Sequence, residues 1–131
     1  MERPPLPRPP YCIHTRVQVL RVLDGDTVEV QGELFGGSVV VRLLGIDAPE
    51  LHSQSPAQRA KAKLARELLE RLALNRRTCS LLVPLPEKPH YNLLREVTSF
   101  GRVLGHLYLD DETLAADELV KEGVARWSSA P

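Results

Sequence analysis

Four carboxylates and one arginine fall into two short segments of the sequence, a combination typical of sites that act on phosphate through a metal ion. They are Asp24, Asp26, Arg42, Asp47 and Glu50. A hard divalent cation prefers carboxylate oxygens, backbone carbonyls and water as ligands. A planar guanidinium can give two parallel hydrogen bonds to phosphate oxygens. If folding brings the two segments together, we expect a metal-and-phosphate site.

Hydrolysis of a phosphodiester bond would give each of these groups a task. Asp26, Asp47 and the backbone carbonyl that follows Asp47 would hold a cation that activates the attacking water. Glu50 would orient or deprotonate that water. Arg42, together with Arg102 at the entry to a later strand, would neutralise charge that builds on the phosphoryl oxygens. The residues therefore predict a metal-dependent phosphodiesterase.

Each acidic segment also has a simpler interpretation. Asp24 and Asp26 flank Gly25, and Asp-Gly is favoured in hairpin turns because both residues tolerate a positive φ. Asp47 and Glu50 have the spacing of a helix capping box. From the spacing alone, both interpretations stay open.

Arg42 interrupts an apolar run that is expected to be a strand. By parity its side chain shares a face with Val40, Leu44 and Ile46. An unpaired guanidinium among apolar side chains would be very costly, so Arg42 needs carboxylates or a bound anion. A structural ion pair with one of the acids and a phosphate clamp are both compatible with this requirement.

The first helix has a clear start and end in the sequence. Ser55 is a good N-cap, Pro56 suits the first helical position, Gln58 completes a capping box, and Asn75 ends the helix. Basic residues, Lys61 and others, are expected on a solvated face. The apolar stripe at helical spacing is expected to be Leu64, Leu68 and Leu72, with Ala65 and Leu69 beside them.

The remaining pattern is mostly that of strands. A short second helix is expected over 115–122, with Gly123 as its C-cap and an extended stub over 124–127. Strands are expected over 14–23, 27–31, 38–46, 78–83 and 102–109. Five mostly antiparallel strands with a helix between the third and the fourth predict a mainly β fold with helices (α+β), a small Greek-key barrel of the OB type.

The bulk composition limits the alternatives. With 131 residues the chain is expected to form one domain, over 14–131, after a proline-rich arm at 1–13 that is expected to be a solvated tail. Its zero net charge argues mildly against non-specific coating of nucleic acid. Cys12 and Cys79 lack zinc-site spacing and are expected to be free thiols, with a disulfide left open. Without a visible signal peptide we expect a cytoplasmic protein, or a secreted one if a leader was removed.

Four ordered motifs resemble the staphylococcal nuclease (thermonuclease-like) family between Val17 and Ala125. They are Leu-Asp-Gly-Asp-Thr-Val, Arg-Leu-Leu-Gly-Ile-Asp-Ala-Pro-Glu, Phe-Gly-Arg before a strand, and Glu-Leu-Val-Lys-Glu-Gly-Val-Ala. The resemblance implies an OB-type barrel and calcium-dependent cleavage of DNA and RNA that leaves 3′-phosphate ends. Whether cutting is internal or from an end is left open.

The resemblance also implies roles for individual residues. Arg42 and Arg102 would clamp the phosphate, and Glu50 would act on the water. The calcium ligands would be Asp26, Asp47 and the backbone carbonyl of Ala48, with Asp24 just outside them.

The sequence departs from the family pattern at two places. Thr98, Ser99 and Phe100 replace the usual Asp-Lys-Tyr, so a lysine and a phenolic hydroxyl that can hold the terminal phosphate are absent. Well-known members continue with nucleotide-contacting tyrosines and a third helix, which the sequence to Pro131 lacks. We therefore expect self-association or a partner chain to cover the open side of the barrel. The rival hypothesis is a catalytically weak or inactive OB-fold module that binds nucleic acid or protein.

Overall fold

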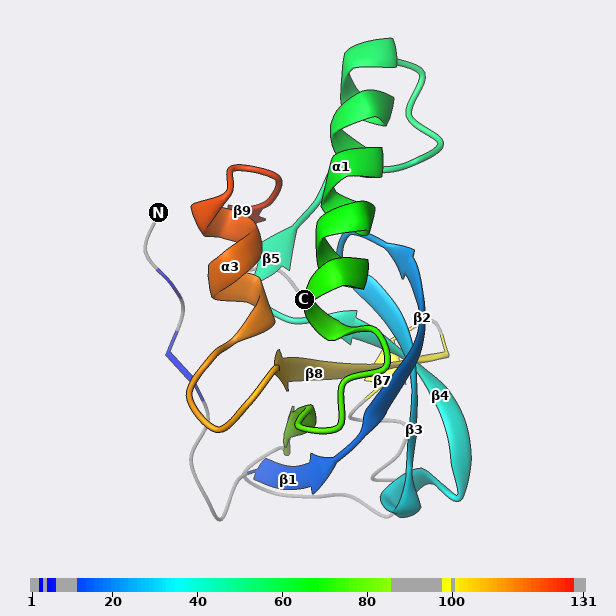
Figure 1. The fold of residues 1–131 in the computed structure, drawn as a ribbon, viewed down its shortest axis with the longest axis vertical. Coiled ribbons are helices and arrows are strands. Elements are labelled where there is room, and N and C mark those ends of the chain that lie inside the picture. The colour runs from blue at the N-terminus through cyan, green and yellow to red at the C-terminus, as the bar shows by residue number, and fades with distance from the viewer. Residues whose placement is uncertain (1–2, 4, 7–11, 86–97, 100, 129–131) are drawn as a thin grey trace.

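The computed structural model describes residues 3, 5–6, 12–85, 98–99 and 101–128. Most of the proline-rich arm, residues 86–97 and Phe100 lie outside the described residues. The fold is mixed α+β (Figure 1). Its elements are β1 (Cys12–Arg16), β2 (Gln18–Asp24), β3 (Thr27–Gly32), the 3-10 helix η1 (Glu33–Phe35), β4 (Gly37–Leu43), β5 (Ile46–Asp47), α1 (Pro56–Ala73), β6 (Ser80–Pro84), β7 (Thr98–Ser99), β8 (Arg102–Tyr108), α3 (Ala115–Lys121) and β9 (Arg126–Trp127).

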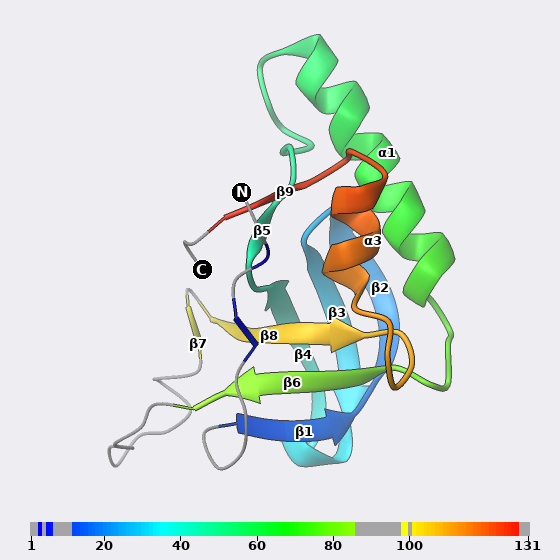
Figure 2. The same ribbon diagram turned by 90° about the vertical axis from the view of Figure 1, so that its left-hand side faces the viewer.

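Six strands form one sheet in the order β1-β6-β8-β4-β3-β2, and β7 pairs with β8. Figure 2 shows β1, β6 and β8 running side by side. The pairs are antiparallel except β4–β8, which is parallel. The expected first strand is divided at Val17, whose N–H donates to the Cys79 carbonyl at 3.1 Å. Within the described residues β1 and β2 do not pair with each other, so the sheet is open there.

The expected third strand also ends early. It stops at Leu43 because the chain turns at Gly45, whose φ of 84° lies in the left-handed region that favours glycine. Ile46 and Asp47 then pair with the C-terminal strand β9, where Asp47 lies opposite Arg126. Figure 2 shows β5 and β9 together, away from the main sheet. The turn thus moves Asp47 off the strand that carries Arg42.

The core lies on the face of β4 opposite Arg42. Val41 belongs to the buried cluster, whereas Val40 and Leu44 do not. Ile46 does belong to the core, but it follows the turn at Gly45 and is therefore not on the strand that carries Arg42. The expectation that Arg42 shares a face with core residues is therefore wrong. Alternation along β4 puts the arginine on the side of the sheet away from the core.

Helix α1 begins as predicted. The Ser55 hydroxyl accepts a hydrogen bond from the Gln58 N–H at 3.3 Å, and Pro56 is the first helical residue. The Ser55 N–H donates to the Ser53 hydroxyl at 3.2 Å. Asn75, just past the end, has a φ of 60°.

The buried stripe of α1 differs from the predicted leucine stripe. Leu64 is 57% exposed, and Leu68 and Leu72 are only partly buried. The reason is close packing, since small side chains let the helix approach β2 and the Asp24–Asp26 turn. The buried residues are Ala62, Ala65, Leu69 and Ala73.

Gly25 shows how close this approach is. A Cβ added there would lie 2.7 Å from the Ala65 Cβ and 2.8 Å from the Ala48 Cβ. Gly25 is not among the residues with positive φ, so the expected turn-geometry reason for glycine is wrong. Glycine is needed because helix α1 and the segment after β5 both press against the turn.

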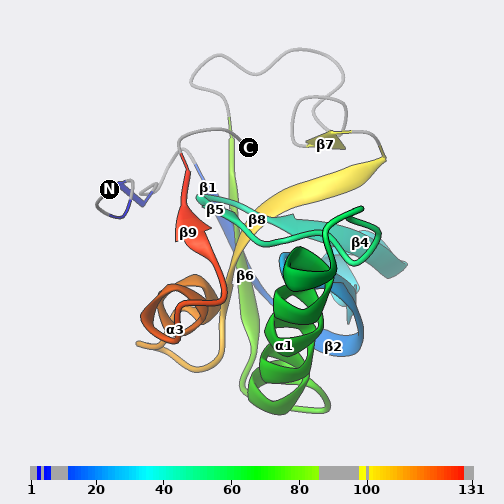
Figure 3. The same cartoon turned by 90° about the horizontal axis from the view of Figure 1, so that it is seen from above.

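Helix α3 packs against α1 and β8 (Figures 1 and 3). Gly123 follows it with a φ of 76°, as predicted for its C-cap, and the chain then enters β9. Two described residues of the arm contact the domain: Arg3 pairs with Asp117 at 2.8 Å, and Leu6 packs against the core. These contacts correct the expectation of a fully solvated tail.

Cys12 and Cys79 are free thiols. In the part of the chain that the structure describes, no helix has both the length and the apolar character needed to cross a bilayer.

His106 on β8 gives the fold a pH dependence. Burial, and secondarily the Arg3 charge, lower the pKa of this histidine from 6.5 to about 4. The unfolded chain therefore binds the proton first, and the free energy of unfolding should fall as pH drops from 6.5 to about 4. The full effect is roughly 3 kcal/mol. Urea unfolding at several pH values should show the loss in wild type and not in His106→Gln.

The exposed His14, substituted as His14→Gln, is the control and should keep the wild-type pH profile. An identical acid sensitivity in wild type and His106→Gln would contradict the assignment.

The Gly25 contact gives a second prediction. Gly25→Ala should lower the free energy of unfolding by about 1–3 kcal/mol, because the added methyl overpacks the turn against α1. Gly37→Ala is the matched control, since nothing lies within 4 Å of its added Cβ. It should change stability by no more than about 1 kcal/mol. Equal urea midpoints for the two variants would contradict the packing explanation.

Candidate active site

The Arg42 guanidinium is the centre of the site. Its side chain is 9% exposed, and Nη2 lies 2.9 Å from Asp47 Oδ1 and 3.3 Å from Asp26 Oδ2. Nη1 donates to the Leu43 carbonyl. A buried Arg42 was predicted to need carboxylates or a bound anion, and the structure supplies two carboxylates. The hairpin acid and the acid beyond β4 therefore meet at one nitrogen atom.

Asp26 is held by hydrogen bonds on both oxygens. Oδ1 accepts from the Thr27 hydroxyl at 3.0 Å, and Oδ2 accepts from the Ala48 N–H at 3.2 Å. Thr27 pairs with Arg42 in the β3–β4 register, which places both on the same face. Thr27 was not predicted as a site residue, although the hairpin register around Gly36 places it opposite Arg42. These bonds fix the carboxylate in the position where it meets Arg42.

Asp24 and Glu50 lie at the edge of this group. Burial raises the pKa of Asp24, the Gly25 N–H at 2.9 Å opposes that rise, and the charges of Asp26 and Glu50 add to it. Both charges must be near for this effect. Glu50 itself is exposed, so its carboxylate is open to solvent, whereas Asp24 is partly buried.

Arg102 is placed by strand register. In the parallel β4–β8 pair, Arg42 lies opposite Leu104, and Arg102 is two residues before Leu104 on β8. Side chains two residues apart on a strand share a face, so Arg102 is on the same side of the sheet as Arg42. It is partly buried. The structure thus brings Asp26, Arg42 and Asp47 into contact, with Arg102 on the neighbouring strand.

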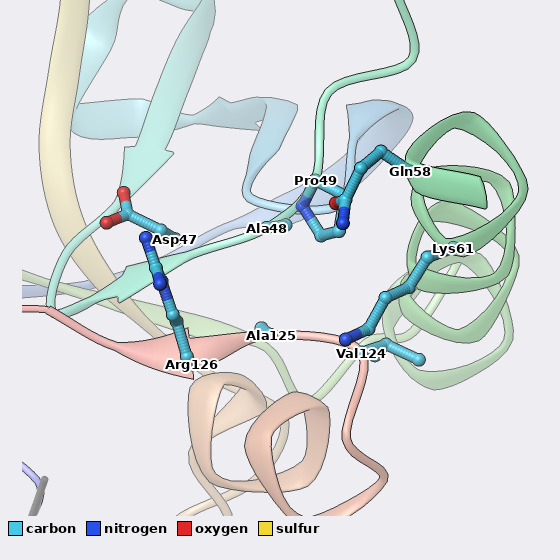
Figure 4. Close-up of a pocket in the computed structure, with 8 residues that line it drawn as sticks. All are labelled: Asp47, Ala48, Pro49, Gln58, Lys61, Val124, Ala125 and Arg126. Carbon is cyan, nitrogen blue, oxygen red and sulfur yellow. The ribbon is translucent and has the colours of Figure 1, made fainter. Parts of the chain in front are cut away.

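The far side of Asp47 borders a pocket of about 320 Å³ (Figure 4). Two basic side chains on its walls were not predicted as site residues: Lys61, assigned to a solvated helix face, and Arg126. Arg126 reaches the pocket through the β5–β9 pairing, which no local pattern signals. The lining residues are Asp47, Ala48, Pro49, Gln58, Lys61, Val124, Ala125 and Arg126.

The donor chemistry fits a hard cation with an incomplete protein ligand set. Asp26 and Asp47 carboxylates converge on one point, which the guanidinium now contacts. Carboxylate oxygens are the ligands that calcium prefers. Over residues 12–85 and 101–128 and the other described positions, no group of three or more His, Cys, Asp or Glu side chains is arranged as a metal site. The role of the Ala48 carbonyl stays a prediction.

Comparison with known proteins supports the same region. No curated protein matches the chain. The family model described as staphylococcal nuclease homologue matches residues 40–130, a range that contains Arg42, Asp47, Glu50 and Arg102. Because this match spans more than half of the sequence, the chain belongs to the staphylococcal nuclease homologue family.

Proposed function

We propose that the chain is a calcium-dependent nuclease that hydrolyses phosphodiester bonds of DNA and RNA and leaves 3′-phosphate ends. Family membership supports a nuclease-like function. The observation that carries the proposal is the contact of one guanidinium with both Asp26 and Asp47. It joins the phosphate-binding group and the proposed metal ligands in one place.

The acids around Arg42 explain why a cation is needed. Asp24, Asp26, Asp47 and Glu50 carry more negative charge than Arg42 can neutralise, so the group would repel a phosphodiester. Calcium held by Asp26, Asp47 and the Ala48 carbonyl would supply Lewis-acid activation of phosphate and water. The Thr27 and Ala48 hydrogen bonds keep Asp26 oriented for this role.

The two arginines would stabilise the transition state. Arg42 is fixed by its ion pairs, and Arg102 lies on the same face of the adjacent strand. From there their guanidinium groups would bind the non-bridging phosphoryl oxygens, where negative charge increases during attack. Donors fixed in advance at such a position need no reorganisation in the transition state.

Glu50 is the group suited to accept a proton from water. Its carboxylate is exposed, whereas Asp26 is buried and both of its oxygens accept hydrogen bonds. A base must reach the attacking water as well as lie near the phosphate. Of the four acids, Glu50 is the one classed as exposed, and Asp47 is already paired with Arg42.

An OB-type barrel is the architecture we infer from the open sheet. Strands β1 and β2 form its two ends in the pairing order, yet only Val17 separates them in the chain. They would be the two halves of one bent strand that closes a five-stranded barrel, with α1 between the third and fourth strands. The parallel β4–β8 pair follows from this order.

The role of Glu50 can be tested without disturbing the core. Glu50→Gln should lower kcat on single-stranded DNA by about 10²-fold or more, because the amide cannot accept the proton. The exposed Glu122→Gln is the control and should cleave like wild type. Equal kcat for Glu50→Gln and wild type, after removal of host nucleases, would rule out the assigned role.

The calcium requirement can be tested directly. Cleavage of single- and double-stranded DNA and of RNA should stop in excess chelator and return when calcium is added back. Mass spectrometry of the products should find 3′-phosphate ends. Full activity in chelator would exclude the proposed role of Asp26 and Asp47. Tight single-strand binding without cleavage, with calcium present, would instead identify a binding module.

A further inference from the structure

The pocket beside Asp47 is built from three separate segments (Figure 4). They are β5 with Ala48 and Pro49, the first turns of α1, and the stretch from Val124 to Arg126. The close contact of α1 with the Asp24–Asp26 turn and the β5–β9 pairing bring these segments together. The pocket is therefore a product of the same packing that assembles the acids and Arg42.

Its charged groups favour an anion. Figure 4 shows the Lys61 ammonium reaching into the cavity from α1 and the Arg126 side chain extending along the wall toward Asp47. The one acid in the lining, Asp47, is already paired with Arg42 at 2.9 Å. Two cations thus line the cavity against a single carboxylate, which Arg42 contacts from its other side.

The rest of the lining suits the sugar or base of a nucleotide. Ala48, Pro49, Val124 and Ala125 form apolar wall between the charged groups, and Gln58 adds an amide. The volume of about 320 Å³ lies at the lower end of ligand pockets. A single nucleotide is the size of ligand that such a cavity accepts. Its phosphate would meet the basic side chains, and its sugar or base would meet the apolar wall.

Asp47 belongs to both this pocket and the Arg42 group. A strand whose scissile phosphate lies at Arg42 and Arg102 would pass Asp47 to reach the pocket. We infer that the pocket binds the nucleotide adjacent to the scissile phosphate, with Lys61 and Arg126 on its phosphate and the apolar wall against its sugar or base. This inference rests on the proposed function and adds the substrate contact that sets the minimum strand length.

The test compares Lys61→Met with Lys63→Met. Both lysines are exposed on α1, but Lys63 does not line the pocket, and methionine keeps the helix and the side-chain length. On a twelve-nucleotide single strand with calcium, Lys61→Met should raise KM roughly tenfold and leave kcat unchanged. On bis(p-nitrophenyl) phosphate, which has no nucleotide, kcat/KM should not change. Lys63→Met should match wild type on both substrates.

A binding measurement separates this inference from the proposed function. In a Glu50→Gln background with calcium, fluorescence anisotropy should show a roughly tenfold weaker Kd for Lys61→Met. The slope of log Kd against log salt concentration should also be smaller by about 0.7, because one phosphate contact is lost. Arg126→Gln should act in the same direction. Equal KM and Kd for the Lys61 and Lys63 variants would overturn the pocket assignment while wild-type cleavage leaves the nuclease proposal standing. No cleavage by wild type would refute the nuclease proposal. The pocket assignment would then be tested by binding alone: a weaker Kd for Lys61→Met than for Lys63→Met would support it, and equal Kd values would overturn it.

Discussion

The buried guanidinium of Arg42 is the interaction on which the site and much of the surrounding fold depend. It joins β4 to the turn after β2 and to β5, because its Nη2 contacts both Asp26 and Asp47. Loss of the guanidinium would leave the buried Asp26 charge without compensation, which costs about 3–5 kcal/mol in a buried pair, whereas Asp47 is 41% exposed and would be partly solvated. The three side chains therefore hold one another in place, and the contacts that stabilise the fold are the ones that the proposed phosphate site would use.

Close packing on the other side of the turn completes this arrangement. Gly25 leaves room for Ala65 of α1 and for Ala48, and the Ala48 N–H in turn donates to Asp26. The position of the Asp26 carboxylate is thus fixed by a helix, a hairpin and the segment after β5 together. A larger side chain at the turn would shift the carboxylate as well as strain the core, so stability and chemistry depend on the same few contacts.

Local signals in the sequence predicted the parts of the fold that local forces decide. The Ser55 cap, the helix end near Asn75 and the left-handed Gly123 all follow from short-range backbone chemistry. The meeting of Asp26, Arg42 and Asp47 followed from the cost of burying an unpaired charge. Long-range packing decided the rest: alanines replaced the expected leucines because α1 lies so close to the turn, and β5–β9 pairing placed Arg126.

The zero net charge of the chain does not conflict with a nucleic-acid substrate, because the structure separates its charges locally. Acids gather around Arg42, where the proposed calcium would bind, and Lys61 and Arg126 line the neighbouring pocket. A sum over the sequence cancels these two regions, although a bound strand would meet them in turn. Long-range attraction by the whole protein would be weak, so affinity must come from short contacts in the pocket and at the cation. An enzyme of this kind would recognise a strand by its fit next to the scissile bond rather than by bulk charge.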